Sequence, residues 1–239
     1  MREPGSYIGQ ELVLFENAKR WKRYFASFIK PYVGKRTIEV GPGLGANTMF
    51  LNDGSAELWL MPEPDAGMFA LVEQKIADHI LPANCKATNT TLEGLEPKAD
   101  YNTILYIDVL EHIANDKAET QVALDLLKPG GYLVILAPAF QSLYSPFDKA
   151  IGHFRRYTRS SLKEVVPASL KQVKLWYLDS AAYFLSLSNR LLLKQKYPTQ
   201  KQVNTWDRFV VPVSGITDRI ANYSFGKSIL GIWKKDGTD

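Results

Sequence analysis

Short apolar runs alternate, in the first half of the chain, with segments whose apolar residues recur every three or four positions. The runs are rich in branched and aromatic side chains, which is typical of strands buried on both faces. They predict strands over 35–40, 56–61, 85–88, 101–107 and 132–137. The segments between them predict helices over 46–51, 65–79 and 119–127. This alternation predicts a parallel sheet covered by helices on both faces.

The pattern changes on either side of this region. Helical spacing over 9–30 predicts a helix that ends before Pro31. Residues 140–159 are polar and aromatic and predict a long loop, followed by a helix that Ser161 and Glu164 would open as a capping box. Two further strands are predicted around a mainly helical stretch, over 171–178 and 224–233. A loop-and-helix insertion of this kind usually carries substrate specificity.

The length of 239 residues fits a single domain over 1–239. We expect three parts before the last strand, namely an N-terminal cap helix, a cofactor-binding core, and a loop and helical substrate cap, over 1–34, 35–139 and 140–223. Lys and Arg outnumber Asp and Glu by 29 to 25 without a long basic run, so no nucleic-acid partner is expected.

The single cysteine, Cys85, excludes an internal disulfide and fits a reducing compartment. It falls in a predicted strand, and we interpret it as an inert buried thiol. The first ten residues lack the apolar core of a signal peptide, so we expect a cytoplasmic protein.

A glycine loop, Gly41-Pro42-Gly43-Leu44-Gly45, follows the first predicted strand directly. Ligands of open α/β sheets bind at the carboxyl ends of the strands, where glycine allows close backbone approach and the next helix offers free N–H groups. Three interpretations remain at this point. The loop would hold the pyrophosphate of a dinucleotide, another adenosine-bearing cofactor, or no ligand at all.

Glu63 ends the second predicted strand, close to the roughly twenty positions after the loop at which a carboxylate binds ribose hydroxyls. The alternative is a solvated loop carboxylate. The dinucleotide fingerprint fits less well, because the third glycine comes one residue early and Pro42 separates the first two. The pattern therefore favours a different adenosine cofactor.

Five segments resemble the successive motifs of class I S-adenosylmethionine-dependent methyltransferases, in the family's order and spacing over about residues 36–138. They are IEVGPGLG, LMPEPD, NTTLEGL, YNTILYIDVLEHI and LLKPGGYLVILAP. The resemblance implies a doubly wound, seven-stranded, mostly parallel sheet of Rossmann-like type with an antiparallel last strand. It also implies an enzyme that moves a methyl group from S-adenosyl-L-methionine to O or N of a small-molecule, glycan or lipid-intermediate acceptor, by in-line displacement, and releases S-adenosyl-L-homocysteine.

The resemblance assigns cofactor-binding roles by position. The residues placed near the methionine moiety are Trp21, Glu39, Gly41, Pro42, Gly43, Gly45, Asp108, Val109 and His112. Glu63 would hold the ribose diol, and the residues placed around the adenine are Pro64, Thr91 and Leu92. Asn89 stands where many members have an aspartate for the adenine amino group, so that contact would come from the backbone.

Three of these roles have structural alternatives. Asp108 would otherwise cap a helix that begins near Glu111. Trp21 or Tyr24 would contact a sulfonium through the ring face, or would only pack in the core. His112 is expected to pack or form a hydrogen bond beside the glycine loop, and the alternative is that it is the general base.

The stretch PFDKAIGHFRRYTRSSL lies after the fifth predicted strand, on the ligand side of the sheet. Methyl transfer mainly needs alignment, and a base if the acceptor is a hydroxyl or ammonium. We expect His153 to be that base or to orient the acceptor, and Arg156 and Tyr157 to bind its polar group, with Asp108 and Tyr157 as further catalytic candidates. Alternatively, Arg155 or Arg156 pairs with Asp148 to hold the loop. A similar G-H-x-R-R-Y loop occurs in a subgroup that resembles enzymes of bacterial glycan and lipid-linked sugar pathways.

Asp148, Arg155, Tyr183 and Trp206 are candidates for binding the acceptor, with Phe184 and Phe209 beside them, although helical apolar residues are more often core. The basic residues Arg190, Lys194 and Lys196 would suit a peripheral membrane contact. His79 is interpreted as a helix end that interacts with the dipole.

No Cys/His set has zinc spacing and no carboxylates cluster as for magnesium, so no metal is expected. An NAD-dependent oxidoreductase and a non-catalytic cofactor-binding module remain the alternatives.

Overall fold

The computed structural model describes residues 10–189 and 197–237. Its centre is a seven-stranded sheet in the order β3-β2-β1-β4-β5-β7-β6. The strands are β1 (Arg36–Val40), β2 (Leu58–Pro62), β3 (Cys85–Thr88), β4 (Tyr101–Ile107), β5 (Leu127–Pro138), β6 (Leu170–Leu178) and β7 (Ser228–Lys235). β7 runs antiparallel to both β5 and β6, whereas the neighbours from β3 to β5 are parallel. The predicted seven-stranded, mostly parallel sheet is confirmed.

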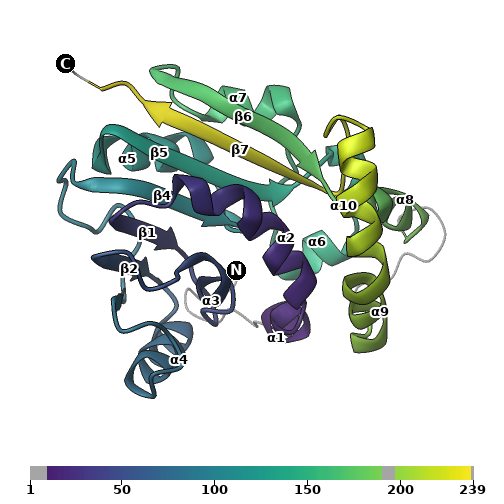
Figure 1. Cartoon of the computed structure of the whole chain (residues 1–239), viewed down its shortest axis with the longest axis horizontal. Helices are drawn as coiled ribbons and strands as arrows, with labels where there is room; N and C mark the ends of the chain where they lie inside the picture. Colours follow the sequence, from purple (N-terminus) through teal and green to yellow (C-terminus); the bar gives the residue numbers. More distant parts are fainter. Residues whose placement is uncertain (1–9, 190–196, 238–239) are drawn as a thin grey trace.

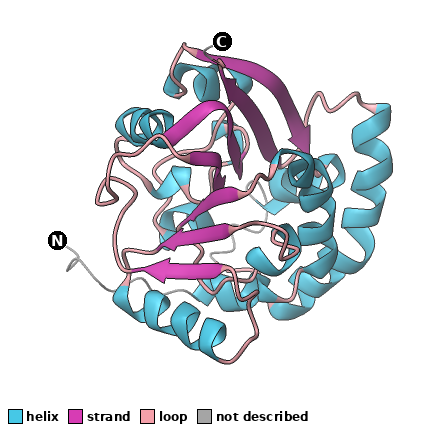
Figure 2. Ribbon diagram, turned by 60° about the vertical axis from the view of Figure 1, so that its left-hand side comes forward, coloured by secondary structure: helices cyan, strands magenta, loops and turns pink. Residues whose placement is uncertain are grey.

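Helices cover both faces of the sheet (Figure 2). They are α1 (Gln10–Glu16), α2 (Lys19–Ile29), α3 (Thr48–Leu51), α4 (Ala66–Ala77), α5 (Asp116–Leu126), α6 (Pro146–Ile151), α7 (Arg159–Val165), α8 (Ser180–Ser188), α9 (Gln200–Thr205) and α10 (Val211–Ile220). Side chains alternate along each strand, so that on β4 Leu105 and Ile107 join one core and Ile104 and Tyr106 the other.

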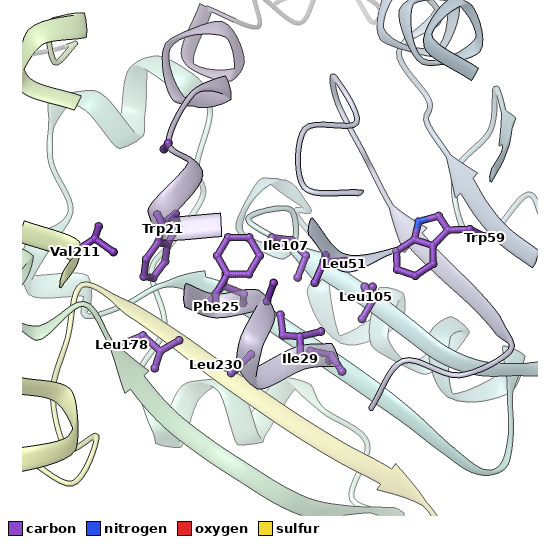
Figure 3. Packing of buried hydrophobic residues seen from close by; sticks show 14 of the residues in the cluster. Trp21, Phe25, Ile29, Leu51, Trp59, Leu105, Ile107, Leu178, Val211 and Leu230 are labelled. Carbon is purple, nitrogen blue, oxygen red and sulfur yellow. The ribbon is translucent and has the colours of Figure 1, made fainter. Parts of the chain in front are cut away.

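The first of these cores forms because α2 has a regular apolar face. Trp21, Phe25 and Ile29, at helical spacing, are buried against the sheet. Figure 3 shows them between side chains of the sheet, including Leu230 and Ile107. The second core, on the opposite face, is built with residues of α5 and α7.

Three local predictions differ from the structure. The predicted N-terminal helix is two helices, α1 and α2, which are separated after Glu16. α7 begins after Thr158, which forms the capping box with Ser161, so the box expected from Ser161 and Glu164 was wrong. The predicted loop over 140–159 contains α6, and Ser145 and Asp148 form the capping box of that helix.

Most of the helices outside the parallel core gather at one end of the sheet. Figure 1 shows α6, α8, α9 and α10 at the end to which β4 and β5 point. α1 lies over the glycine loop, where Leu12 contacts Gly43. β6 falls within the range 140–223 that was expected to be a cap, yet it is the edge strand of the main sheet. Among the described residues, no helix is long and apolar enough to cross a membrane.

Candidate active site

The glycine loop between β1 and α3 forms a narrow backbone cradle. Gly41, Gly43 and Gly45 have φ of 57°, 57° and 68°, a region that residues with a side chain rarely adopt. A Cβ on Gly41 would lie 3.2 Å from the methyl carbons of Val109, and one on Gly43 would lie 2.9 Å from Leu12. The glycines therefore provide the turn and allow Val109 and Leu12 to pack directly against the loop.

Glu63, at the end of β2, supports this cradle. Its carboxylate accepts hydrogen bonds from the backbone N–H groups of Gly43 and Asp65, both at 3.1 Å. Asn89 donates to the backbone carbonyl of Glu63 at 2.8 Å. Burial raises the pKa of Glu63, which is only 6% exposed. It is therefore not the solvated loop carboxylate of the alternative interpretation.

Glu39, near the end of β1, is a second buried carboxylate below the cradle. Its Oε2 accepts hydrogen bonds from Thr48 Oγ1 at 2.7 Å and from Trp59 Nε1 at 2.8 Å. No described residue donates to its Oε1. Burial raises the pKa of Glu39 to about 7, although both hydrogen bonds oppose this rise.

The residues expected around an adenine differ in their surroundings. Pro64 and Thr91 are exposed, whereas Leu92 is buried in the core on the α5 face of the sheet. Leu92 therefore contributes to folding, and of the three only Pro64 and Thr91 present accessible surface.

A cavity of about 190 Å³ lies at the carboxyl ends of β1 and β4. It is bordered by Gly41 and Pro42 of the glycine loop. Its charged and titratable lining residues are Glu11, Lys22, Asp108, Glu111, His112, Asp148, His153, Arg156 and Lys227. Its aromatic lining residues are Phe15, Trp21, Phe25, Phe147 and Trp206. The fold thus collects polar groups from four distant parts of the sequence beside the glycine loop.

Asp108 lies immediately after β4, at the point where the strand order of the sheet reverses between β1 and β4. Its φ is 55°, and its backbone N–H donates to Leu136 of β5 at 2.8 Å. The short 3-10 turn that follows, Leu110–His112, has no side-chain cap, so Asp108 does not have the capping role of the alternative interpretation. Burial raises the pKa of Asp108, and the charges of His153 and Lys227 oppose this rise.

Asp148, in α6, makes contacts that hold the segment after β5 together. It is fully buried and accepts hydrogen bonds from Arg156 Nε at 2.8 Å and Nη2 at 2.9 Å. It also accepts from the backbone and hydroxyl of Ser145, and its Oδ1 lies 2.9 Å from His153 Nδ1. Burial raises the pKa of Asp148, but the bonds to His153 and Arg156 outweigh it and lower the pKa overall. The ion pair of the alternative interpretation is therefore present.

Arg155 and Tyr157, expected at the acceptor, are engaged elsewhere. Arg155 pairs with Asp116 and donates to the carbonyl of Ala114 at 2.8 Å. Tyr157 is 1% exposed, and its hydroxyl donates to Asp116 at 2.8 Å. Neither residue lines the cavity, so both hold the loop against the start of α5.

His112 and His153 face each other across the cavity wall. Their rings are T-shaped, with centroids 4.6 Å apart. Burial, and then the charge of His153, lowers the pKa of His112 to about 3. His153 Nε2 lies 3.7 Å from Oε1 of Glu111, a fully buried residue whose pKa burial raises well above its usual range.

A second cavity, of about 620 Å³, lies next to the first. Five residues line both, namely Phe15, Phe147, Arg156, Trp206 and Lys227. Most of its other lining side chains are apolar or small and uncharged, including Leu143, Ala182, Leu185, Val203 and Val210. A small cavity rich in charged residues therefore adjoins a larger one lined by apolar and uncharged polar side chains, whose charged residues are Arg156, Lys201 and Lys227.

Of the residues predicted to form an acceptor pocket, some line these cavities and others do not. Trp206 lines both of them. Tyr183 lines neither and packs against Phe140 and Phe225 instead. Phe184 and Phe209 are 58% and 60% exposed. The basic residues Arg190, Lys194 and Lys196 lie outside the described residues.

Sequence reasoning missed Lys22, Glu111 and Lys227. Burial lowers the pKa of Lys22 to about 8, and its Nζ donates to the carbonyl of Phe15 at 2.6 Å. Lys227 Nζ lies 4.3 Å from the centre of the Trp206 ring, and burial lowers its pKa. Lys22 follows Trp21 on the buried side of α2, and Glu111 lies within the quoted motif YNTILYIDVLEHI, whereas Lys227 had no sequence signal.

Comparison with known proteins identifies the family. A family model described as a methyltransferase domain matches residues 16–169, and no curated protein matches the chain in sequence. A SAM-dependent methyltransferase from Archaeoglobus fulgidus has a TM-score of 0.63 and 16% identity, over 95% of this chain and 100% of its own. Geranyl diphosphate C-methyltransferase from Streptomyces coelicolor A3(2) has a TM-score of 0.66 and 10% identity, over 98% and 86%. The [4+2]-cyclase SpnF has a TM-score of 0.63 and 14% identity, over 90% and 82%.

The family match covers more than half of the chain, so the chain belongs to this methyltransferase family. It is a class I, S-adenosylmethionine-dependent methyltransferase with a Rossmann-like fold, and its cofactor is S-adenosyl-L-methionine. The oxidoreductase alternative is thereby removed.

Proposed function

We propose that this methyltransferase acts, by in-line displacement, on an O or N atom of a small-molecule or lipid-type acceptor that carries an apolar part and an anionic group. The observation that supports this is the pair of adjoining cavities, one small, rich in charged residues and beside the glycine loop, the other larger and lined by apolar and mostly uncharged polar side chains. Pockets that orient a ligand by a few polar groups within an apolar lining are typical of small-molecule sites.

The cofactor would lie on the loop from Gly41 to Gly45. The loop fits such a group because its residues Gly41 and Pro42 border the small cavity, where the backbone is accessible. A carboxylate accepts about four hydrogen bonds, and Glu63 uses two of them on backbone N–H groups, which leaves capacity for the ribose hydroxyls. Glu39 Oε1 is a further acceptor below the loop. When bound, the cofactor supplies a methyl group on a positively charged sulfur.

The acceptor would place its apolar part in the larger cavity and its anionic group near Lys227. This lysine lines both cavities and stacks over Trp206, so it lies where the two spaces meet. Geranyl diphosphate, which a structural neighbour binds, combines the same two chemical features. A charge-assisted bond from Lys227 would fix the depth of the acceptor, and hence the distance of its nucleophile from the glycine loop.

The nucleophile would then lie in the small cavity, near Asp108 and His153. A hydroxyl or ammonium acceptor must lose a proton, and Asp108 is a carboxylate that lines this space. His153 would orient the acceptor, because Asp148 fixes its ring through Nδ1 and leaves Nε2 for the cavity side. Arg156 holds Asp148 and, because it also lines both cavities, would add positive charge where the two spaces meet.

The cofactor site is tested with Glu63→Ala. We expect this variant to bind S-adenosylhomocysteine about tenfold or more weakly than the wild type, because a charge-assisted hydrogen bond contributes about 1.4 kcal/mol or more. Calorimetric titration measures this, with Glu73→Ala, an exposed site on α4, as the matched control and NAD as the control ligand. If the wild type does not bind S-adenosylhomocysteine, the proposed cofactor site is wrong. If Glu63→Ala and Glu73→Ala bind it equally well, Glu63 does not contact the ribose.

The acceptor class is tested with Lys227→Met. Methionine has a side chain of similar length to lysine but carries no charge. We expect the wild type to bind decyl phosphate about tenfold or more tightly than decanol, and the variant to lose this preference. Trp206 lies beside Lys227, so the tryptophan fluorescence of the protein, to which Trp206 contributes, is used to follow the binding. Lys163→Met, on the exposed side of α7, is the control. Equal affinities of the wild type for both amphiphiles would contradict the anionic acceptor.

A further inference from the structure

Three side chains with metal-binding atoms meet at one wall of the small cavity. Glu111 and His112 come from the turn after β4, and His153 comes from the loop after α6. One ligand atom from each lies within 4.8 Å of the other two. The pair formed by His153 Nε2 and Glu111 Oε1 is 3.7 Å apart.

Glu111 has a carboxylate that the protein leaves unsatisfied. It is fully buried, and no described residue forms a hydrogen bond with either of its side-chain oxygens. Burying an ionised carboxylate without a hydrogen-bond partner costs several kcal/mol, so such a group keeps its proton, is paired or coordinates a metal. Neither oxygen of Glu111 has a hydrogen-bond partner among the described residues, and the carboxylate lies where the two imidazoles converge.

His153 is held as metal-binding histidines usually are. Asp148 Oδ1 lies 2.9 Å from Nδ1 of its ring, which fixes the ring orientation and leaves Nε2 on the side of Glu111. Histidines that bind metals almost always engage the other ring nitrogen with a carboxylate, a carbonyl or water. Arg156 and Ser145 hold Asp148 in turn, so the support is itself rigid.

We propose that Glu111, His112 and His153 bind one divalent transition-metal ion, of the Zn²⁺ or Co²⁺ type, with an open coordination position toward the cavity. Two imidazoles and one carboxylate suit these ions, whereas Mg²⁺ and Ca²⁺ prefer oxygen ligands only. Bonds of about 2.0–2.1 Å in a tetrahedron place neighbouring ligand atoms about 3.3 Å apart. The 3.7 Å pair is close to this separation, and small side-chain rotations would bring in the third ligand.

The ion would act on the acceptor, a role that rests on the proposed function. An acceptor hydroxyl in the open position would lose its proton more readily, because a bound metal stabilises the resulting oxyanion. Asp108 lines the same cavity and would take that proton. His153 would thus orient the acceptor through the ion, which explains why its ring is fixed from behind by Asp148.

The test is metal uptake by the full chain after treatment with a chelator. We expect Zn²⁺ titration by calorimetry to show one equivalent bound, and Co²⁺ to give a visible absorption band of an ion with nitrogen and oxygen ligands. Glu111→Gln and His153→Ala should each weaken Zn²⁺ binding about a hundredfold or more, as loss of one of three ligands implies. His79→Ala removes the exposed third histidine and should bind as the wild type does.

S-adenosylhomocysteine binding is measured on the same samples, which separates the two proposals. A variant that binds S-adenosylhomocysteine normally but takes up no metal is folded, and this result supports the metal site. If one of the two variants, Glu111→Gln or His153→Ala, is unfolded, the metal uptake of the other is the test. A wild type that binds it but takes up no stoichiometric Zn²⁺ or Co²⁺ overturns the metal site and leaves the proposed function standing. The metal site is also overturned if Glu111→Gln binds Zn²⁺ as the wild type does, since the ion is then adventitious.

Discussion

Asp148→Ala should lower the free energy of unfolding by about 3–5 kcal/mol, because breaking a buried ion pair leaves the other charge buried and unpaired. Arg156, which is 9% exposed, would keep only the carbonyl of Ala139 as a hydrogen-bond acceptor for its guanidinium, at 3.4 Å. The substitution also removes the capping box at the start of α6. Urea unfolding of the variant and the wild type measures the difference.

A surface ion pair provides the matched control. Asp236 pairs with Lys171 at 2.9 Å, but their side chains are 57% and 75% exposed. Asp236→Ala should therefore cost no more than about 1 kcal/mol. Adding Arg156→Met to Asp148→Ala should restore part of the loss, since it removes the unpaired charge. A cost for Asp148→Ala as small as that for Asp236→Ala would show that Asp148 does not hold the loop.

The sheet could be predicted because its signal is local. Strands such as β4 and β5 are apolar on both faces, and each is followed by a polar turn or a helix, so period and length identify them. The ends of the helices were harder to predict from the sequence. Thr158 and Ser161 form a capping box with no acidic side chain, whereas Ser161 and Glu164 match the usual sequence signature. The structure selects Thr158 because Tyr157 is anchored on Asp116.

The roles of the loop after β5 could not be read from the sequence, because they depend on partners far along the chain. The cluster of Asp148, His153 and Arg156 was recognised, but residue types alone do not tell a catalytic group from an ion pair. Asp116, which engages both Arg155 and Tyr157, carries no sequence signal for that contact. The juxtaposition of His112 and His153 likewise follows only from the fold.

The position of Lys227 and the larger cavity could not be predicted from the sequence either. A lone lysine before a strand resembles any surface residue, and its place between two cavities depends on how α9 and the turn at Trp206 pack. The apolar residues of α8 and α9 were expected either to form a pocket or to pack in the core. Of the four aromatic residues for which this was expected, Trp206 meets both descriptions, since it is a buried core residue that also lines both cavities.

Glu39→Gln should stabilise the protein at alkaline pH and have little effect at acid pH. Burial raises the pKa of Glu39 from 4.5 to about 7 in the folded protein. Below 4.5 the carboxyl is protonated in both the folded and the unfolded state, so its burial carries no ionisation cost. As pH rises toward 7 the unfolded chain loses this proton while the folded protein keeps it, and stability falls. Above 7 the cost is constant, at about 3 kcal/mol.

The glutamine side chain carries no such cost, so the difference between variant and wild type isolates the ionisation of Glu39. That difference should grow in favour of the variant by about 2–3 kcal/mol between about pH 5 and about pH 8, as measured by urea unfolding. The hydrogen bonds from Thr48 and Trp59 both reach one oxygen, so the amide oxygen of glutamine can accept them at every pH.

Glu57→Gln is the control of opposite sign. Glu57 is exposed, and its hydrogen bond from Lys35 lowers its pKa, so its contribution is lost as pH falls. Its variant should therefore lose stability relative to the wild type as pH rises through the acid range, rather than gain it. If the difference between Glu39→Gln and the wild type is the same at both pH values, Glu39 titrates as an ordinary carboxyl and is not the buried acceptor below the glycine loop.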